Sequence, residues 1–298
     1  MVFNVSEISK GAYGFSVVGV SYAGKPKDST AMYITKKVER LLENLRGKKQ
    51  CLVFTENTIA VPDELKADNC FVLTSTPQKD YAEFVNAWAE EIEKANAKRK
   101  YSISPEGAYI GENVVIGKNS VLEPGCYIGH DVVIGDNARI RAGAVIKNSI
   151  IGDGFIAGEN CTVGTTGFTM ADDENGNKMR IPTLGDVVIG NNVEVGALTN
   201  VSRGSAGSTS LDDCVKLDSL VHIGHDVHLH KNVEIPAGAI IGGFADIGES
   251  AYVGINAVVR NRITIGERAF IGMGAVVTKS VEPDTTVVGN PAKKLERK

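Results

Sequence analysis

The stretch LDDCVKLDSLVHIGHDVHLHKNVEIPAGAIIGG, residues 211–243, has an aliphatic side chain at every sixth position. The period runs on to Val277 without a miss, and an earlier block repeats it over residues 110–146. Two further blocks continue it, one after a single-residue slip at Ile151 and one after an insertion before Ile189. A repeat this regular is the first feature to interpret.

A period of six fits neither an α-helix nor an alternating strand. It fits a chain that forms one short strand, turns a corner and forms the next, so that three sides close a triangular coil of 18 residues. The aliphatic residues then point inward, and the glycine that often follows relieves crowding and permits positive φ near the corners. Successive coils stack as parallel strands about 4.8 Å apart. Hairpins would need alternation with period two and two-residue turns. We therefore predict a parallel β-helix.

Two segments interrupt the period. Residues 165–187 form a polar excursion that must leave the β-helix as a loop, and residues 203–208 form a shorter bulge. Long loops on a rigid scaffold are more often functional than idle, so we expect the first segment to take part in a site.

The first hundred residues lack the six-residue period and alternate strand and helix patterns. We predict an α+β chain with a small α/β domain over residues 1–100 and a β-helical domain over residues 101–298, with a loop insertion at 165–187. Neither GxGxxG nor GxxxxGK[ST] occurs, so no dinucleotide or phosphate motif is assigned. The predicted strands are residues 15–22, 30–34, 50–54 and 68–74, and the predicted helices are residues 36–46 and 80–100.

The composition excludes several classes of protein. A net charge of -4 gives no basic field for nucleic acid. No apolar run reaches the length of a membrane span or of a signal sequence, so we expect neither. The five cysteines are scattered and lie in strand-like sequence, which is typical of reduced, buried residues in a cytoplasmic protein.

Four of the five histidines fall within residues 222–230. His222 and His228 each precede an inward residue and lie one side of the triangle apart, so their imidazoles should point towards different faces. A zinc site needs ligands that converge at about 2.0–2.1 Å. We therefore expect no metal site within one chain, while a site shared between subunits stays open.

His225 is the histidine with a chemical partner. Gly243 follows it by 18 residues and should lie directly above it on the next coil, about 4.8 Å away. An imidazole beside an unobstructed backbone N–H suits acyl transfer, since the base takes a proton from the attacking group and the N–H binds the tetrahedral oxyanion. Asp226 could orient the base, although a surface aspartate is the default interpretation, as a corner glycine is for Gly243.

The stretches VVIGNNVEVGALTNVSRG (187–204) and VKLDSLVHIGHDV (215–227) resemble the UDP-3-O-acylglucosamine N-acyltransferases of lipid A synthesis, and GTTGFTMADDENGNKMRIPTLG (164–185) resembles the active-site loop of that family. The resemblance covers most of residues 30–265. It implies a left-handed β-helix of hexapeptide repeats, a homotrimer with sites between subunits, and an N-terminal domain that binds the nucleotide.

The resemblance also implies roles for individual residues. His225 would be the general base and Gly243 the oxyanion donor. Tyr33 would match one of two aromatic residues that stack on the uracil, and no aromatic residue stands at the second position. The second active-site histidine of the family, near the donor arm, falls at Arg262.

The ending VVGNPAKKLERK (287–298) resembles instead the acetyl-CoA-dependent sugar acetyltransferases, which also carry a pair like His225–Asp226. In these enzymes the last coils lie by the CoA tail, so Lys293 and Lys294 would approach its phosphates. The helices that help dock acyl carrier protein in lipid A enzymes are missing, which favours acyl-CoA as the donor.

The leading hypothesis is an N-acyltransferase that uses acyl-CoA, holds no tightly bound cofactor and acts on a nucleotide-linked amino sugar. Phe168 and Arg203 are candidates for the acceptor side, with loop packing or a loop salt bridge as the alternative. Three other hypotheses stay open: an acyl-carrier-protein-dependent UDP-3-O-acylglucosamine N-acyltransferase, a metal-dependent β-helix enzyme of the carbonic anhydrase kind, and a non-catalytic scaffold.

Overall fold

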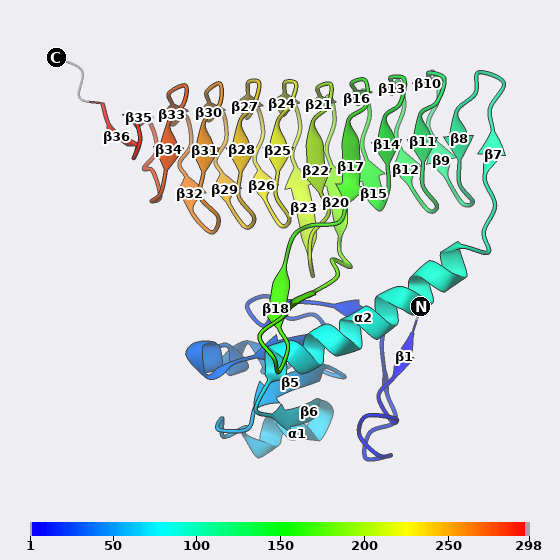
Figure 1. Cartoon of the computed structure of the whole chain (residues 1–298), viewed down its shortest axis with the longest axis vertical. Coiled ribbons are helices and arrows are strands. Elements are labelled where there is room, and N and C mark those ends of the chain that lie inside the picture. The colour runs from blue at the N-terminus through cyan, green and yellow to red at the C-terminus, as the bar shows by residue number, and fades with distance from the viewer. Residues whose placement is uncertain (1, 296–298) are drawn as a thin grey trace. The chain divides into compact units, whose positions relative to one another are not determined.

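The computed structural model describes residues 2–295, which form two compact units (Figure 1). The first unit comprises the chain up to Ala97 together with Phe168–Leu184, and the second comprises Lys98–Gly167 and the chain from Gly185 onward. The sequence alone assigned residues 165–187 to the β-helical domain as an insertion. Most of that insertion instead folds with the N-terminal residues.

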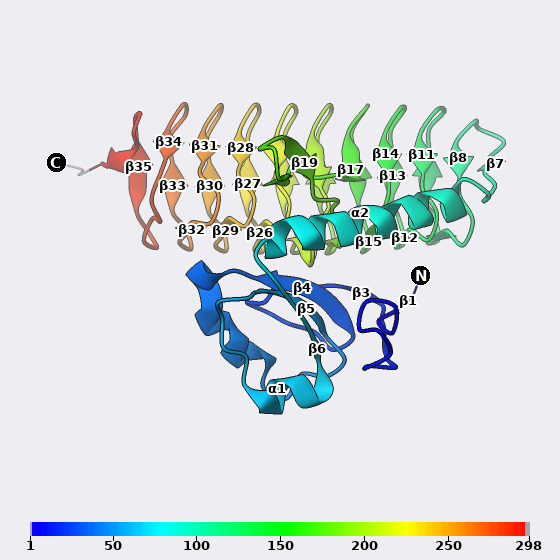
Figure 2. The ribbon, with the colours of Figure 1, turned by 60° about the horizontal axis from the view of Figure 1, so that its bottom comes forward.

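The first unit is built on a parallel sheet with strand order β3-β4-β5-β6 (Figure 2). Adjacent residues of a strand face opposite sides: Val53 packs with Met32 and residues of η1 and α1, whereas Phe54 contacts Tyr81 and Phe84 of α2. Each face of the sheet is therefore covered. The elements are β1 (Phe3–Asn4), β2 (Ser16–Val17), β3 (Gly19–Val20), β4 (Thr30–Ile34), the 3₁₀ helix η1 (Lys36–Leu45), β5 (Leu52–Glu56), α1 (Asp63–Asp68), β6 (Cys70–Thr74) and α2 (Pro77–Asn96).

Some predicted elements differ in detail. The helix predicted at 36–46 is a 3₁₀ helix, interrupted at Val38, where φ is −127° and ψ is 24°. Helix α2 begins three residues earlier than predicted, at Pro77, since proline suits a first helical turn. Helix α1 was not predicted because six residues carry too little periodicity. None of the helices among residues 2–295 is long and apolar enough to cross a membrane.

The segment inserted after β17 forms an antiparallel hairpin, β18 (Met170–Asp172) and β19 (Lys178–Arg180), that packs on α2. The amide of Asn86 donates to the backbone carbonyl of Arg180 at 2.7 Å, and Lys79 forms an ion pair with Glu174 at 2.7 Å. The hairpin is therefore held by residues of α2 that lie about ninety positions away in the sequence.

The second unit is the predicted parallel β-helix, with three sheets that we name A, B and C. All neighbouring strands are parallel except the pairs that include β7 and β36. Sheet A contains β10 (Val121–Leu122), β13 (Arg139–Ile140), β16 (Ile156–Ala157), β21 (Glu194–Val195), β24 (Lys216–Leu217), β27 (Glu234–Ile235), β30 (Tyr252–Val253), β33 (Phe270–Ile271), β35 (Thr286–Val288) and β36 (Lys293–Lys294). Sheet B contains β7 (Ser102–Ile103), β8 (Tyr109–Ile110), β11 (Tyr127–Ile128), β14 (Val145–Ile146), β17 (Thr162–Thr165), β22 (Asn200–Ser202), β25 (His222–Ile223), β28 (Ile240–Ile241), β31 (Val258–Val259) and β34 (Val276–Val277). Sheet C contains β9 (Val115–Ile116), β12 (Val133–Ile134), β15 (Ser149–Ile151), β20 (Asp186–Ile189), β23 (Ser208–Leu211), β26 (His228–Leu229), β29 (Asp246–Ile247) and β32 (Thr264–Ile265).

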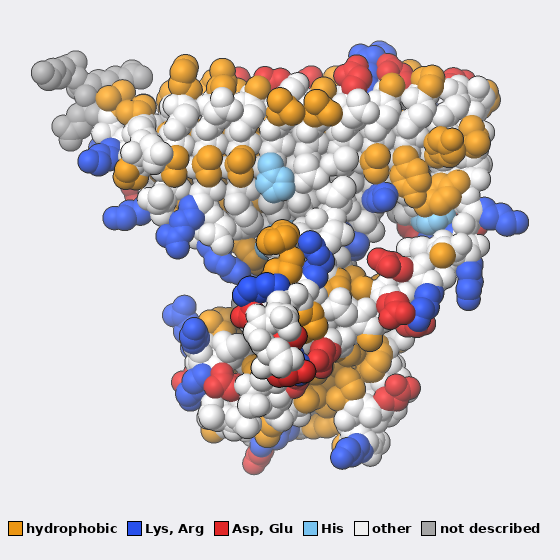
Figure 3. Space-filling model, in the orientation of Figure 1, with side chains coloured by type: hydrophobic (Ala, Val, Ile, Leu, Met, Phe, Trp, Pro, Cys, Tyr) orange, Lys and Arg blue, Asp and Glu red, His pale blue; other side chains and the backbone are white. Residues whose placement is uncertain are grey.

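The six-residue aliphatic series forms the core of the β-helix. From Ile128 to Val277 its members are buried, while those of the first coil, such as Ile110, are only half-buried because no coil covers them from below. Most coils contain 18 residues, as in the pairing of Ile223 with Ile241. Exposed apolar side chains also lie in rows on the outer surface of the β-helix (Figure 3). They include Tyr109, Val121, Ile240 and Phe270.

The glycines after the inward residues relieve crowding, as predicted, whereas Gly117 does not have the positive φ that was also predicted. A Cβ atom on Gly117 would lie 2.3 Å from the backbone of Gly135 in the next coil, so glycine is needed there for close approach and not for positive φ. Positive φ occurs two residues later, where Asn113 and Asn137 have φ of 58° and 60°. Asparagine tolerates this region better than most residues.

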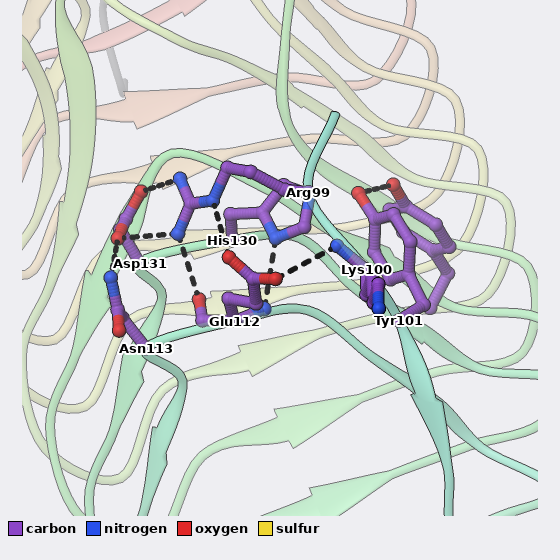
Figure 4. A network of polar contacts seen from close by, with 8 residues as sticks. Arg99, Lys100, Tyr101, Glu112, Asn113, His130 and Asp131 are labelled. Carbon is purple, nitrogen blue, oxygen red and sulfur yellow. Dashed lines mark hydrogen bonds and ion pairs between the residues drawn. The ribbon is translucent and has the colours of Figure 1, made fainter. Parts of the chain in front are cut away.

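A polar network joins the first two coils (Figure 4). Arg99 donates to Asp131 at 2.9 Å and to the backbone carbonyl of Glu112 at 3.1 Å, and the Glu112 N–H donates to Nδ1 of His130 at 2.9 Å. The ring of Tyr101 lies 4.5 Å from that of His130. These contacts fix the chain where the β-helix begins.

Candidate active site

His225 lies at the corner that follows β25, between sheets B and C. The pairing of β22, β25 and β28 places Arg203 one coil below His225 and Gly243 one coil above it. We call these three residues the corner column. The 18-residue spacing correctly predicted that His225 and Gly243 meet.

The His225 ring is held by a buried carboxylate. Its Nδ1 lies 2.8 Å from Oδ2 of Asp226, whose side chain is only 5% exposed. The same Oδ2 accepts hydrogen bonds from the backbone N–H of Ser205 at 2.9 Å and from its hydroxyl at 2.6 Å. An ionised carboxylate accepts only, so the proton of the neutral imidazole sits on Nδ1 and the lone pair on Nε2. Nε2 is then the atom able to act as a base.

Gly243 lies against that nitrogen. A Cβ atom built on Gly243 would lie 3.0 Å from both Cε1 and Nε2 of His225. None of residues 2–295 accepts a hydrogen bond from the Gly243 N–H. At five other corners the N–H in the same position is capped by a side chain of the next coil. The donors there are Glu112, Lys118, Asp136, Asp153 and Asn191, and the acceptors are His130, Asp136, Asp153, Asn191 and Asp213.

An aromatic residue and a cation lie beside this pair. The edge of the Phe244 ring meets the His225 ring at a centroid distance of 5.2 Å, and the Arg262 guanidinium lies 3.9 Å over the Phe244 ring. The Arg262 N–H donates to the carbonyl of Gly243 at 3.1 Å. Arg262, which the sequence assigned to the donor side, is thus a neighbour of the corner column.

Arg203 places a partly buried cation beneath His225. Its Nε donates to the carbonyl of Gly185 at 2.6 Å. Burial lowers the pKa of the Arg203 guanidinium to about 10, and the nearby Asp186 carboxylate opposes the shift. The side chain therefore stays charged at neutral pH.

The other predicted residues lie elsewhere. Tyr33 and Phe168 belong to the first unit: Tyr33 packs on Tyr81 with ring centroids 5.1 Å apart, and Phe168 is 75% exposed. Lys293 and Lys294 are exposed residues of the last described strand of sheet A, several coils beyond the corner column. The structure does not bring these two lysines to His225.

Two residues of the site were missed. The carboxylate of Asp226 is held by Ser205, and the Asp226 N–H donates to the Thr209 hydroxyl at 2.8 Å. Both lie in or next to the bulge at 203–208, whose break of the period was the one available signal. The bulge therefore serves to bring hydrogen-bond partners to the catalytic candidate.

The remaining histidines lie on two sheets. His222 lies on sheet B and His228 on sheet C, so they do face different sides as predicted. Neighbouring residues partly desolvate the exposed His222 ring, and this effect, followed by the charge of His225, lowers the pKa of His222. The prediction compared His222 with His228 and did not consider Asp212, His228 and His230, whose ligand atoms all lie within 4.8 Å of one another. That no metal binds within one chain stays a prediction.

Comparison with known proteins supports this description. Residues 113–148 and 244–279 match the family described as bacterial transferase hexapeptide (six repeats). Among solved structures, UDP-N-acetylglucosamine acyltransferase from Campylobacter jejuni has a TM-score of 0.57 and 25% identity, over 65% of this chain and 74% of that one. The enzyme of the same name from Francisella novicida has a TM-score of 0.58 and 25% identity, over 65% of this chain and 68% of that one.

Curated relatives match a shorter stretch. UDP-3-O-acylglucosamine N-acyltransferase 2 from Legionella pneumophila (strain Paris) is 34% identical over 49% of this chain and 43% of its own length. The probable mitochondrial UDP-3-O-acylglucosamine N-acyltransferase 2 from Arabidopsis thaliana is 34% identical over 49% of this chain and 48% of its own length. The chain thus spans less than half the length of these relatives. The predicted left-handed parallel β-helix is confirmed, and residues 113–148 and 244–279 carry the match to the hexapeptide-repeat family.

Proposed function

We propose that this protein transfers an acyl group from a thioester to the amine of a UDP-linked amino sugar of the UDP-3-O-acylglucosamine type. The observation that carries the proposal is the placement of Gly243, without a Cβ, over Nε2 of His225, with Asp226 holding the other side of the ring. The names of the relatives supply the acceptor class.

The reaction follows from these three residues. The amine nitrogen attacks the thioester carbonyl carbon while its proton passes to Nε2 of His225. The Gly243 N–H donates to the oxyanion of the tetrahedral intermediate. Collapse breaks the C–S bond, and the imidazolium returns the proton to the leaving thiolate. The carboxylate of Asp226 stabilises the imidazolium between the two steps.

The proposal places the acyl acceptor between neighbouring subunits. One face of a β-helix is too flat to enclose a sugar and a pantetheine arm, and the rows of exposed apolar residues support a homotrimer with sites between subunits. Tyr33 and Phe168 are proposed to contact the nucleotide sugar, and Arg203 to contact the acceptor side. Arg262 is proposed to face the donor.

The comparisons favour the UDP-3-O-acylglucosamine N-acyltransferase alternative over the leading acyl-CoA hypothesis, because the matched relatives are named for UDP-3-O-acylglucosamine. The proposal does not specify whether CoA or acyl carrier protein carries the acyl group, and the test below compares the two. Lys293 and Lys294 belong to the proposal only if CoA is the donor.

The test is a thiol-release assay with matched acyl-CoA and acyl carrier protein donors, each combined with UDP- and dTDP-linked amino sugars. We expect release with a UDP-sugar, and His225→Ala should lower kcat by about 10²- to 10⁴-fold. His228→Asn on sheet C is the matched control and should retain full turnover. Undiminished turnover in His225→Ala, or no release with any nucleotide sugar, would overturn the proposal.

A further inference from the structure

A second cluster of ligand-type side chains lies on the outer surface of sheet C, across β23, β26 and β29. Strand pairing aligns Ser210 with His228 and His228 with Asp246, so that three successive coils meet there. We propose that Asp212, His228 and His230 form a binding site for Zn²⁺ or a similar divalent metal, supported by Asp246. The site is separate from the proposed reaction and does not depend on it.

The donor atoms already lie near the spacing that a metal requires. Nε2 of His228 is 3.1 Å from each carboxylate oxygen of Asp212, and Nδ1 of His230 is 3.7 Å from Oδ2 of Asp212. Tetrahedral zinc with bonds of about 2.0–2.1 Å separates its ligand atoms by roughly 3.3 Å. The two imidazole rings are tilted by 32° to each other at a centroid distance of 3.9 Å. Metal binding would require the His230 side to close, since the three ligand atoms lie within 4.8 Å of one another.

Asp246 determines which nitrogen of His230 carries the proton. Its Oδ1 lies 3.1 Å from Nε2 of His230, the nitrogen on the far side of the ring from Asp212. When Nε2 donates its proton to Asp246, the lone pair of the neutral ring lies on Nδ1 and points at a carboxylate oxygen of Asp212. Nδ1 of His230 and the Asp212 oxygen are then two hydrogen-bond acceptors without a proton between them, and a metal cation could bind to both. A carboxylate behind a ligating histidine is the usual support for such a ligand.

The ligand types select the metal class. Two imidazoles and one carboxylate suit Zn²⁺, Co²⁺, Ni²⁺ or Cu²⁺, whereas Mg²⁺ and Ca²⁺ prefer oxygen ligands throughout. The three side chains are 36–43% exposed, so a fourth position is open to water. Because the ligands come from two adjacent coils, a bound metal would clip these coils together on the outside of the β-helix.

The test is Zn²⁺ binding to the tag-free, full-length protein after chelator treatment, measured by competition with a chromophoric chelator. We expect one equivalent per chain, lost in His228→Ala and in His230→Ala. Asp246→Asn should weaken the affinity by about 10- to 100-fold. His222→Ala, on the same coil but on sheet B, is the matched control, and it and His225→Ala should bind as the unaltered protein does.

Spectroscopy of the metal bound to the unaltered protein identifies the ligands without relying on variants that could misfold. Zinc X-ray absorption of the unaltered protein should show two imidazole ligands, and Co²⁺ should give the visible spectrum of a tetrahedral ion. Absence of saturable binding would overturn the proposal, as would binding that survives the double variant His228→Gln/His230→Gln. If protonation of the cluster changes stability with pH while zinc does not, the four residues form only an ion-pair cluster.

Discussion

Asp226 makes its contacts through one carboxylate oxygen, which meets Nδ1 of His225 and both the N–H and the hydroxyl of Ser205. In Asp226→Asn the amide oxygen can keep all three contacts, but the side chain no longer carries the negative charge that would stabilise the imidazolium. We expect kcat to fall by about 10²-fold or more with little change in KM, since the general base supplies that much.

A milder variant distinguishes a role of Asp226 in orienting His225 from a role in folding. Ser205→Ala removes one of the hydrogen bonds to Asp226 and keeps the carboxylate, so it should lose far less activity than Asp226→Asn. Equal losses in the two variants would mean that the carboxylate matters only as part of the bulge.

At Gly243, adding a single methyl group should lower activity and leave stability unchanged. In Gly243→Ala the Cβ would lie 3.0 Å from Nε2 of His225 and would occupy the space of the incoming amine. We expect kcat to fall by about 10²- to 10³-fold, which is the loss seen when an oxyanion donor is removed. Circular dichroism should show an unchanged fold.

Gly129→Ala provides the control for that substitution. Its Cβ would meet chiefly the flexible side chain of Lys147, at 3.1 Å, so the side chain can move aside. This variant should keep its turnover. A similar loss of activity in both variants would indicate a general effect of crowding between coils.

At the scale of elements, the network of Arg99 at the start of the β-helix should make stability depend on pH. Hydrogen bonds from Arg99 lower the pKa of Asp131, and a backbone hydrogen bond from Lys100 followed by Arg99 lowers that of Glu112. Because the pKa is lower in the folded state, the stabilisation is full above the unfolded pKa of about 4 and is lost as the pH falls through the folded value.

We therefore expect Arg99→Ala to have a lower melting temperature than the unaltered protein at pH 7. The difference between the two should shrink as the pH falls below about 4. Lys98→Ala, next to it in the chain, should melt as the unaltered protein does. A difference that stays constant down to acidic pH would show that Arg99 acts through packing alone.

Elements also show what a sequence can and cannot reveal. The pairing of His225 with Gly243 could be predicted because each follows an inward aliphatic residue by two positions, and strand pairing carries that spacing from coil to coil. The contact between Asp212 and His228 is diagonal across two coils and depends on side-chain rotamers, so it cannot be predicted from the spacing of the two residues. The hairpin after β17 gave only a break in the period, because its partners on α2 carry no local signal.

At the scale of the whole molecule, the two units have separate cores, which predicts separate folding. A variant lacking residues 1–97 should keep the β-sheet spectrum of the β-helix and a cooperative thermal transition, because the aliphatic series is complete without them. It should lose binding of the UDP-sugar, measured by calorimetry, since Tyr33 is removed. The reciprocal control is Tyr33→Ala in the full chain, which should weaken binding and leave the melting of the β-helix unchanged.

The coils of this β-helix differ in length while their strands stay aligned. Ile134 pairs with Ile151 after 17 residues, Ile151 with Ile189 after 38, and Ile189 with Leu211 after 22. The extra or missing residues lie at corners, so the aliphatic side chains of the strands still point into the core. Genetic insertions and deletions should therefore be tolerated best at corners outside the corner column, where the outer loops can change in length without moving His225 or Gly243.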